Sequence, residues 1–162
     1  MEIMKKILLI LLFGVMSAGT QAQLPSVLLK DMNGKVVDTK DLANEDRPVL
    51  ISFFATWCKP CMRELTAIHD LYPDWQERYN LHIYIVSVDQ GQDVQKVKPL
   101  VDGKAWEYDV LLDEDGELKR AMNVQSIPHS FLIDKDGTII FNHVGYTDGD
   151  EAEVETKLKI DS

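Results

Sequence analysis

The chain has 162 residues, 45% of them hydrophobic, and carries 27 acidic against 17 basic side chains, which gives a formal charge of −10 at pH 7. This length predicts one domain with a sizeable hydrophobic core. The acidic balance argues against binding to nucleic acid or to anionic lipid, because both need basic patches on the protein surface.

The first 22 residues have the pattern of a secretory signal peptide. Two lysines precede an apolar run over residues 7–13, and small and polar residues follow as far as Ala22. The apolar run has about half of the length needed to span a bilayer, so we favour cleavage after Ala22 over an uncleaved membrane anchor. We therefore divide the chain into a signal peptide at residues 1–22 and one folded domain at residues 23–162.

The first part of the folded domain predicts a hairpin and then a buried strand. Extended segments at residues 24–30 and 35–38 flank an Asn-Gly pair, which is typical of tight β-turns. A helical turn and loop are expected at residues 41–46. The following run at residues 48–54 is apolar and rich in β-branched and aromatic side chains, which predicts a buried strand.

A long helix is predicted from Cys58 to about Tyr79. Its apolar side chains recur three and four residues apart, at Met62, Leu65, Ile68, Tyr72 and Trp75. This spacing places them on one face of a helix. A proline in the first turn is tolerated because its missing N–H is not needed there, whereas Pro73 predicts a kink or break near residues 71–72.

The remaining elements alternate between strand and helix. Strands are predicted at residues 81–88, 108–112, 130–134 and 138–143, and helices at residues 93–101, 117–123 and 150–160. The last two strands are joined by an Asp-Gly pair and should be antiparallel, whereas the strands on either side of the long helix should be parallel. The acidic run at residues 113–117 is interpreted as a solvated turn, since it lacks the ligand spacing of a calcium loop. The predicted class is α/β, with helices on both faces of a mixed sheet.

Cys58 and Cys61 are the only two cysteines, and they lie where the buried strand ends and the long helix begins. The partial positive charge of a helix N-terminus stabilises a thiolate, so a thiol becomes reactive there. A disulfide between them would close a very small loop and constrain little of the unfolded chain, so a structural staple is a poor explanation. A tetrahedral metal site needs four ligands, and the four histidines show no matching spacing. The pair therefore indicates redox chemistry.

The run Trp57-Cys58-Lys59-Pro60-Cys61, with Ile127-Pro128 just before the strand at 130–134, resembles the active site of the thioredoxin fold. The predicted export signal, the extra N-terminal hairpin and an insertion after the second central strand are similar to the secreted TlpA/ResA-type branch. The resemblance covers roughly residues 24–160. It implies a thioredoxin fold, in which a central mixed sheet is flanked by helices and extended by an N-terminal β-hairpin.

The family implies that Cys58 is the exposed nucleophile and Cys61 the more buried resolving cysteine. In the ResA-like branch a glutamate lies near the thiols three residues after the second cysteine, and Glu64 occupies that position here. It falls one helical turn from Cys61 and could exchange the proton of that thiol if burial raises its pKa; the alternative is a solvated side chain. Cytoplasmic thioredoxins carry a buried aspartate where this chain has Ser52, so Glu64 is the better candidate for proton exchange.

The substrate-binding residues are also assigned by resemblance. Pro128 would be a cis-proline that faces the cysteines and presents the backbone of Ile127 to an extended substrate. Trp57 and Pro60 would shape the site, although Trp57 could instead be an ordinary core residue at a strand end. His129 adjoins the proline and could aid a partner or sense pH, but a packed or solvent-facing histidine is the more common case.

These features predict an exported, periplasmic thiol-disulfide oxidoreductase that reduces disulfides of exported client proteins, such as those awaiting haem attachment in cytochrome c maturation. A membrane thiol-reductase would return electrons to it, because the compartment is oxidising. We expect a monomer that uses no organic cofactor, no metal and no nucleic acid. Two alternatives stay open: a binding module with an inert or docking-only disulfide, and a thiol peroxidase. The peroxidase frame Pro-x-x-x-Thr-x-x-Cys is not matched, since Thr56 precedes Cys58 by two residues rather than three.

Overall fold

The computed structural model describes residues 22–43 and 46–161, so the predicted signal peptide lies almost entirely outside the described residues. Within these residues, the strands form one sheet in the order β2-β1-β5-β4-β3-β6-β7. The strands are β1 (Leu28–Asp31), β2 (Val36–Asp38), β3 (Val49–Phe54), β4 (His82–Ser87), β5 (Asp109–Leu112), β6 (His129–Ile133) and β7 (Ile139–Val144). The helices are α2 (Lys59–Tyr79), α3 (Val97–Lys104), α4 (Glu117–Ala121) and α5 (Glu151–Asp161), with 3₁₀ turns η1 (Thr39–Asp41) and η2 (Gly91–Lys96).

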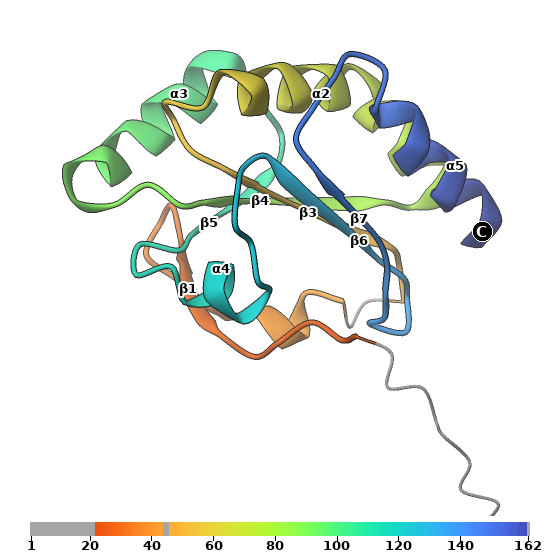
Figure 1. Ribbon diagram of the computed structural model, residues 1–162, viewed down its shortest axis with the longest axis horizontal. Helices are drawn as coiled ribbons and strands as arrows, with labels where there is room; N and C mark the ends of the chain where they lie inside the picture. Colours follow the sequence, from red (N-terminus) through yellow and green to blue (C-terminus); the bar gives the residue numbers. More distant parts are fainter. Residues whose placement is uncertain (1–21, 44–45, 162) are drawn as a thin grey trace, which may run out of the picture.

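The sheet is mixed, as the sequence predicts. β3 runs parallel to β4, and β4 runs parallel to β5, whereas β6 pairs antiparallel with both β3 and β7. The N-terminal hairpin of β1 and β2 adds two antiparallel strands beyond β5. Figure 1 shows α2, α3 and α5 on one face of the sheet and the short helix α4 on the other. The α/β class, the parallel central pair and both hairpins are confirmed, and the architecture is a thioredoxin-like fold with an extra N-terminal hairpin.

The long helix α2 is stabilised by one buried face. Its buried apolar positions are Leu65, Ile68, Tyr72 and Trp75. Burying a large apolar side chain stabilises a fold by about 1.5–3 kcal/mol. Pro73 lies inside the helix without ending it, so the break expected just before it does not occur. A proline in a helix interior costs about 3 kcal/mol, which the aromatic side chains on either side of it offset, and the helix continues to its cap at Asn80.

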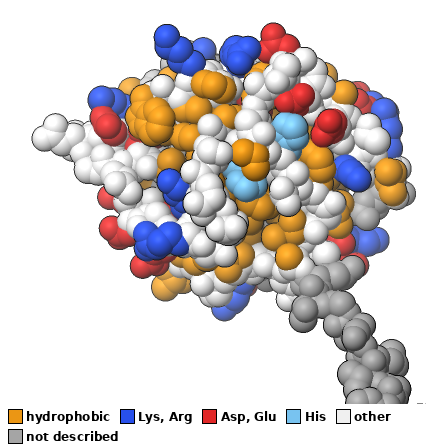
Figure 2. Space-filling model, viewed as in Figure 1, with side chains coloured by type: hydrophobic (Ala, Val, Ile, Leu, Met, Phe, Trp, Pro, Cys, Tyr) orange, Lys and Arg blue, Asp and Glu red, His pale blue; other side chains and the backbone are white. Residues whose placement is uncertain are grey.

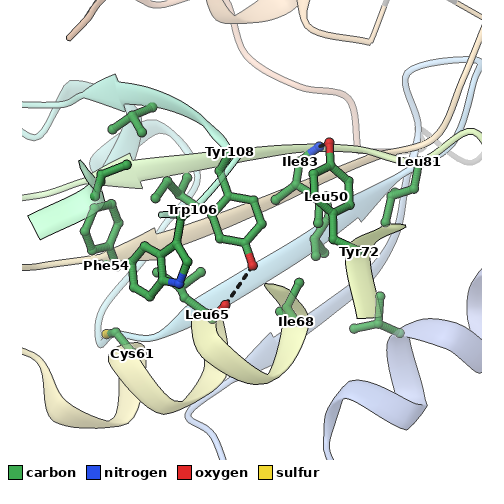
Figure 3. Close-up of a cluster of buried hydrophobic side chains, with 14 of the residues drawn as sticks. Leu50, Phe54, Cys61, Leu65, Ile68, Tyr72, Leu81, Ile83, Trp106 and Tyr108 are labelled. Atoms are coloured by element: carbon green, nitrogen blue, oxygen red, sulfur yellow. Dashed lines mark hydrogen bonds between the residues drawn. The ribbon is translucent and has the colours of Figure 1, made fainter. Parts of the chain in front are cut away.

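Two clusters of buried side chains fill the two sides of the sheet. The cluster under α2, α3 and α5 includes Leu50 and Phe54 of β3, with Cys61 at one end (Figure 3). There the Tyr108 hydroxyl donates a 2.7 Å hydrogen bond to the Leu65 carbonyl, which ties α2 to the segment before β5. The opposite cluster contains the alternate side chains of the same strand. Because β3 is packed on both faces, its end is fixed, and so is the start of the loop that follows.

Three local predictions differ from the structure. The helical turn expected at residues 41–46 forms earlier, as η1, and the helix expected at residues 93–101 is divided into η2 and α3, because η2 buries no side chain against the core. The acidic run is not simply a solvated turn. Asp113 is buried, and its carboxylate accepts the backbone N–H groups of Leu118 and Lys119. These N–H groups belong to the first turn of α4 and have no partner within the helix, so Asp113 stabilises the helix start.

Candidate active site

Cys58 and Cys61 form a disulfide at the start of α2, with an S–S distance of 2.03 Å and a Cα–Cα distance of 5.3 Å. Cys58 is the N-cap residue of the helix, and its Sγ accepts a hydrogen bond from the Cys61 backbone N–H at 3.3 Å. This N–H group and the helix dipole both favour negative charge on the Cys58 sulfur. The arrangement therefore favours the thiolate form of Cys58 once the disulfide is reduced.

Cys58 is less exposed than the resemblance implies. Cys58 is 5% exposed and Cys61 is fully buried. Cys58 is thus the more accessible of the two, as the resemblance implies, but it is itself a buried residue. The physical reason is that both cysteines belong to the hydrophobic cluster under α2, whose side chains pack against them. A molecule that reacts with Cys58 must therefore make close contact with the surface around it.

The loop between β3 and α2 is held by a buried carboxylate that the sequence did not reveal. Asp89 accepts hydrogen bonds from the Thr56 backbone N–H at 2.9 Å and from the Thr56 hydroxyl at 2.7 Å. The Ser87 hydroxyl donates a third hydrogen bond to the same carboxylate, at 2.8 Å. Asp89 lies 33 residues after Thr56, and the parallel pairing of β3 with β4 brings the two together. Asp89 therefore fixes the loop that carries Trp57 and Cys58.

Glu64 lies between α2 and the sheet, one helical turn after Cys61. It is 5% exposed, its Oε2 accepts a hydrogen bond from the Ser52 hydroxyl at 3.0 Å, and its Oε1 accepts one from the Ser130 hydroxyl at 2.7 Å. Ser52 and Ser130 are directly opposite each other on the paired strands β3 and β6. The alternative of a solvated Glu64 is therefore wrong. The serine that replaces the thioredoxin aspartate is a hydrogen-bond partner of this glutamate.

Burial raises the pKa of Glu64 above its ordinary value. The hydrogen bonds from Ser130 and Ser52 and the nearby His143 oppose this shift without cancelling it. A serine hydroxyl can donate to a carboxylate or accept from a carboxylic acid, so both forms of Glu64 can be hydrogen-bonded in this pocket. A carboxyl group with a raised pKa and reversible partners is suited to exchanging a proton with a nearby thiol.

The residues assigned to substrate binding lie at the start of α2 and just before β6. Trp57 is 66% exposed, so it is not an ordinary core residue, and Pro60 is exposed in the first turn of α2. The Ile127–Pro128 peptide bond is cis, as the resemblance implies, and the pairing of β6 with β3 brings it beside the end of β3. A groove of about 560 Å³ extends from Trp57 and Ile127 to residues of η2 and α4. Figure 2 shows one face of the molecule, on which hydrophobic side chains reach the surface in several places between charged ones.

His129 is packed rather than exposed. Its ring stacks on Phe131 with 4.3 Å between ring centroids, on the sheet face opposite α2. Burial lowers the pKa of His129, which keeps its imidazole neutral near pH 7. The interpretation of His129 as a packed residue is therefore favoured over a pH sensor. Over residues 22–43 and 46–161, no three His, Cys, Asp or Glu side chains are grouped so as to hold a metal ion.

A Cys-x-x-Cys disulfide at a helix N-terminus, beside a cis-proline on a mixed sheet of this topology, defines a thioredoxin-like thiol-disulfide oxidoreductase. Comparison with known proteins leads to the same class. The sequence profile of the AhpC/TSA family matches residues 20–142, and the chain belongs to this family.

Relatives and solved structures agree with this assignment. Thiol-disulfide oxidoreductase ResA from Bacillus thuringiensis subsp. konkukian (strain 97-27) is 34% identical over 125 residues, which cover 77% of this chain and 68% of the relative. Thioredoxin-like protein YneN from Bacillus subtilis (strain 168) is 30% identical over 140 residues, or 86% of this chain and 78% of the relative. A thioredoxin-like protein from Porphyromonas gingivalis has a solution structure that is 55% identical, with a TM-score of 0.77 and coverage of 87% and 92%. The resemblance to ResA-type oxidoreductases is confirmed.

Proposed function

We propose that the protein is an exported reductant that uses the Cys58–Cys61 dithiol to reduce disulfides of exported client proteins. The observation that carries this proposal is the cysteine pair at the N-terminus of α2, with the buried Glu64 one turn behind it. The clients include proteins whose cysteines must be reduced before haem attachment, as in cytochrome c maturation. The protein acts as a monomer in the periplasm and needs no metal or organic cofactor.

The reaction takes place in two sulfur exchanges. The Cys58 thiolate attacks one sulfur of the client disulfide, a Cys58–client bond forms, the client S–S bond breaks, and the released client thiolate takes a proton. Cys61 then gives its proton to Glu64 and attacks the Cys58 sulfur. The Cys58–Cys61 disulfide forms, the second client thiolate leaves, and two electrons have passed from the protein to the client.

The groove beside Trp57 is the proposed client-binding surface. Trp57 offers an exposed aromatic face, Pro60 borders the disulfide, and the Ile127 backbone beside the cis Pro128 presents a short extended segment to the client. Because Cys58 is only 5% exposed, a client segment has to lie against the surface around Trp57 for its sulfur to reach the Cys58 sulfur, and we place it in this groove. The groove thus selects extended or unfolded disulfide-bearing segments.

The proposed cycle also requires export of the protein and reduction of its Cys58–Cys61 disulfide after each turnover. The signal-peptide pattern at residues 1–22 supports export. In the part of the chain that the structure describes, no helix combines the length and the apolar character needed to cross a bilayer. In an oxidising compartment the disulfide must be reduced by a dedicated donor, for which we propose a membrane thiol-reductase. Protein recovered from the periplasm should begin at Gln23, and a membrane-bound form that begins at Met1 would contradict cleavage.

The low exposure of Cys58 is the one observation that favours a second function. In that case the protein is a binding module whose disulfide is inert or serves only for docking, and its oxidised and reduced forms bind a partner equally well. A substitution of the resolving cysteine separates the two functions, because only a turnover enzyme leaves a covalent adduct on Cys58.

The experiment uses Cys61→Ala and Cys58→Ser, each incubated in reduced form with exported proteins that contain disulfides. Cys61→Ala should accumulate mixed disulfides that dithiothreitol releases, whereas Cys58→Ser should trap nothing and should lose insulin reduction. An absence of adducts on Cys61→Ala, or insulin reduction by Cys58→Ser, contradicts the proposal. Hydrogen peroxide is added to the reduced wild type as a separate test, and rapid consumption would favour the peroxidase.

A further inference from the structure

A small cavity adjoins Glu64 on a different side from the client groove. It has a volume of about 10 Å³, which is room for about one water molecule. Its polar lining residues are Glu64, Ser130, His143, Tyr146, Asp150 and Glu151. The cavity and the groove beside Trp57 share no lining residue. A water molecule there would have the several polar partners that a buried water needs.

His143 lines this cavity and is partly exposed to solvent. It lies on β7 directly opposite Ser130, the residue on β6 whose hydroxyl donates to Glu64. His143 Nε2 is 3.1 Å from Asp150 Oδ2, and the two side chains are 27% and 26% exposed. Asp150 is itself held in place, because its Oδ2 accepts the Thr147 backbone N–H at 2.7 Å. The imidazole is therefore oriented between the cavity and solvent.

We propose that His143, positioned by Asp150, is the outer end of a proton route that connects Glu64 with solvent through a water molecule in this cavity. The inference rests on the proposed function, since it concerns the proton that Glu64 takes from Cys61. While a client is joined to Cys58, it covers the entrance beside Trp57. A separate route on the β7 side lets Glu64 release its proton before the client leaves.

The proton transfers balance without any further reactant. While the client is still joined to Cys58, Cys61 gives its proton to Glu64 and Glu64 passes a proton to the water molecule, so that the Cys61 thiolate is formed before it attacks Cys58. The water passes a proton to the neutral imidazole of His143, the Asp150 carboxylate stabilises the imidazolium, and the imidazolium releases the proton to solvent. No electrons move in these transfers. The same route runs in reverse when the disulfide is reduced and Cys61 takes a proton back.

The charges around Glu64 are consistent with this route. The titratable groups along the route are Cys61 on α2, Tyr108 before β5, His143 on β7, Tyr146 and Asp150 between β7 and α5, and Glu151 and Glu153 on α5. The Glu153 Oε2 lies 3.6 Å from His143 Nδ1, so carboxylates face both nitrogens of the imidazole. Burial raises the pKa of Tyr108, and burial and the hydrogen bond to Glu151 raise that of Tyr146 to about 12, so both tyrosines keep their protons. His143 adds an imidazole to this set, a side chain whose two ring nitrogens allow it to take up a proton on one side and release one on the other.

The test measures the two sulfur exchanges separately. Reduced protein is mixed with a peptide that carries a fluorescent disulfide, the reaction is stopped with acid, and mass tags report the mixed disulfide and the closed Cys58–Cys61 pair. His143→Gln can still hydrogen-bond to Asp150 but cannot carry the proton. His82→Gln is the matched control, because the Nε2 of His82 is 2.7 Å from Asp109 in a similar histidine–aspartate pair that does not line the cavity.

We expect His143→Gln to slow the second exchange by about tenfold or more between about pH 6 and 8, which is part of the roughly 10²–10⁴-fold that a positioned acid–base group contributes. The first exchange and the His82→Gln control should be unchanged, and added imidazole should restore the rate. Asp150→Asn should slow the same step, and it decides the question if His143→Gln does not fold.

Second-exchange rates equal to wild type in the folded variants would overturn the proton route. If the wild type completes both exchanges and His143→Gln completes the second at the same rate, only the proton route is contradicted. A wild type that forms no mixed disulfide contradicts the proposed function, and the proton route with it.

Discussion

The two carboxylates that flank the active-site disulfide, Glu64 behind it and Asp89 beside the preceding loop, are both buried but are held by different donors. Asp89 accepts from the Thr56 backbone N–H, a group that can only donate, as well as from hydroxyls. Within the described part of the chain, Glu64 accepts from the hydroxyls of Ser52 and Ser130, which can also accept. Burial alone therefore does not mark a proton-exchanging carboxylate. A backbone N–H, which can only donate, stabilises a carboxylate that stays ionised. Hydroxyl groups, which can donate or accept, can bind a carboxyl group in both of its protonation states.

The largest effect on stability is expected from Asp89→Ala. The substitution leaves the Thr56 N–H and two hydroxyls without their acceptor in a buried site, and we expect the free energy of unfolding to fall by about 2–4 kcal/mol. Urea unfolding of the oxidised protein measures the change. Asp93→Ala is the control for stability, since the Asp93 carboxylate forms an exposed ion pair with Lys96. If Asp89→Ala lowers the free energy of unfolding no more than Asp93→Ala does, Asp89 does not stabilise the loop.

Glu64→Gln should affect the reaction rather than the fold. A glutamine amide can hydrogen-bond to both serines, so the urea midpoint near neutral pH should stay the same or rise, because a buried charge is removed. The variant cannot take the Cys61 proton, and we expect the mixed disulfide to persist about 10²-fold longer. The same samples provide both measurements. A destabilisation as large as that of Asp89→Ala would instead make Glu64 a structural residue.

The pH dependence of stability gives a further test of the Glu64 pocket. Because burial raises the pKa of Glu64 above the value of 4.5 for an ordinary glutamate, the folded state holds this proton more tightly than the unfolded chain. Its contribution to stability is full below pH 4.5 and is lost as the pH rises through the raised folded value. The urea midpoint of Glu64→Gln minus that of the wild type should therefore increase as the pH rises from 4.5. A difference that stays constant with pH contradicts the raised pKa.

The smallest effect is expected at the surface, from Arg78→Ala. Arg78 lies 2.9 Å from Asp74 on α2 and 3.1 Å from Glu155 on α5, but water and salt weaken attractions between exposed charges. The melting temperature should change by an amount near the limit of measurement, and added salt should reduce the difference further. A change comparable to that of Asp89→Ala would mean that the contact of α2 with α5 depends on this network rather than on buried side chains.

Local pattern was enough to predict most of the fold and the centre of the site. The apolar run of β3, the helical spacing of α2 and the Asp-Gly turn before β7 each depend on neighbouring residues. The Cys-x-x-Cys pair is equally local, and its position between strand and helix indicated its chemistry. Glu64 is identified by the resemblance to the ResA-like branch, and helix geometry adds only that a residue three positions after Cys61 lies on the same side of α2.

The rest of the site depends on strand register and packing, which a single sequence does not give. Asp89 meets Thr56, and Ser130 meets Glu64, only because β4 and β6 pair with β3 at particular positions. The local cost of a proline predicts a break in α2 near Pro73, whereas the packing energy that offsets this cost comes from contacts distant in the sequence. The low exposure of Cys58 likewise follows from the cluster around it.

The most direct test of electron transfer by Cys58 and Cys61 is the midpoint potential of the pair at pH 7. The oxidised protein is equilibrated with defined mixtures of oxidised and reduced dithiothreitol or glutathione, and mass tags count the free thiols. We predict one two-electron transition at a potential nearer to that of thioredoxin, about −270 mV, than to that of DsbA, about −120 mV. A midpoint near the DsbA value, or a pair that never accepts electrons while the protein stays folded, would contradict a reductant.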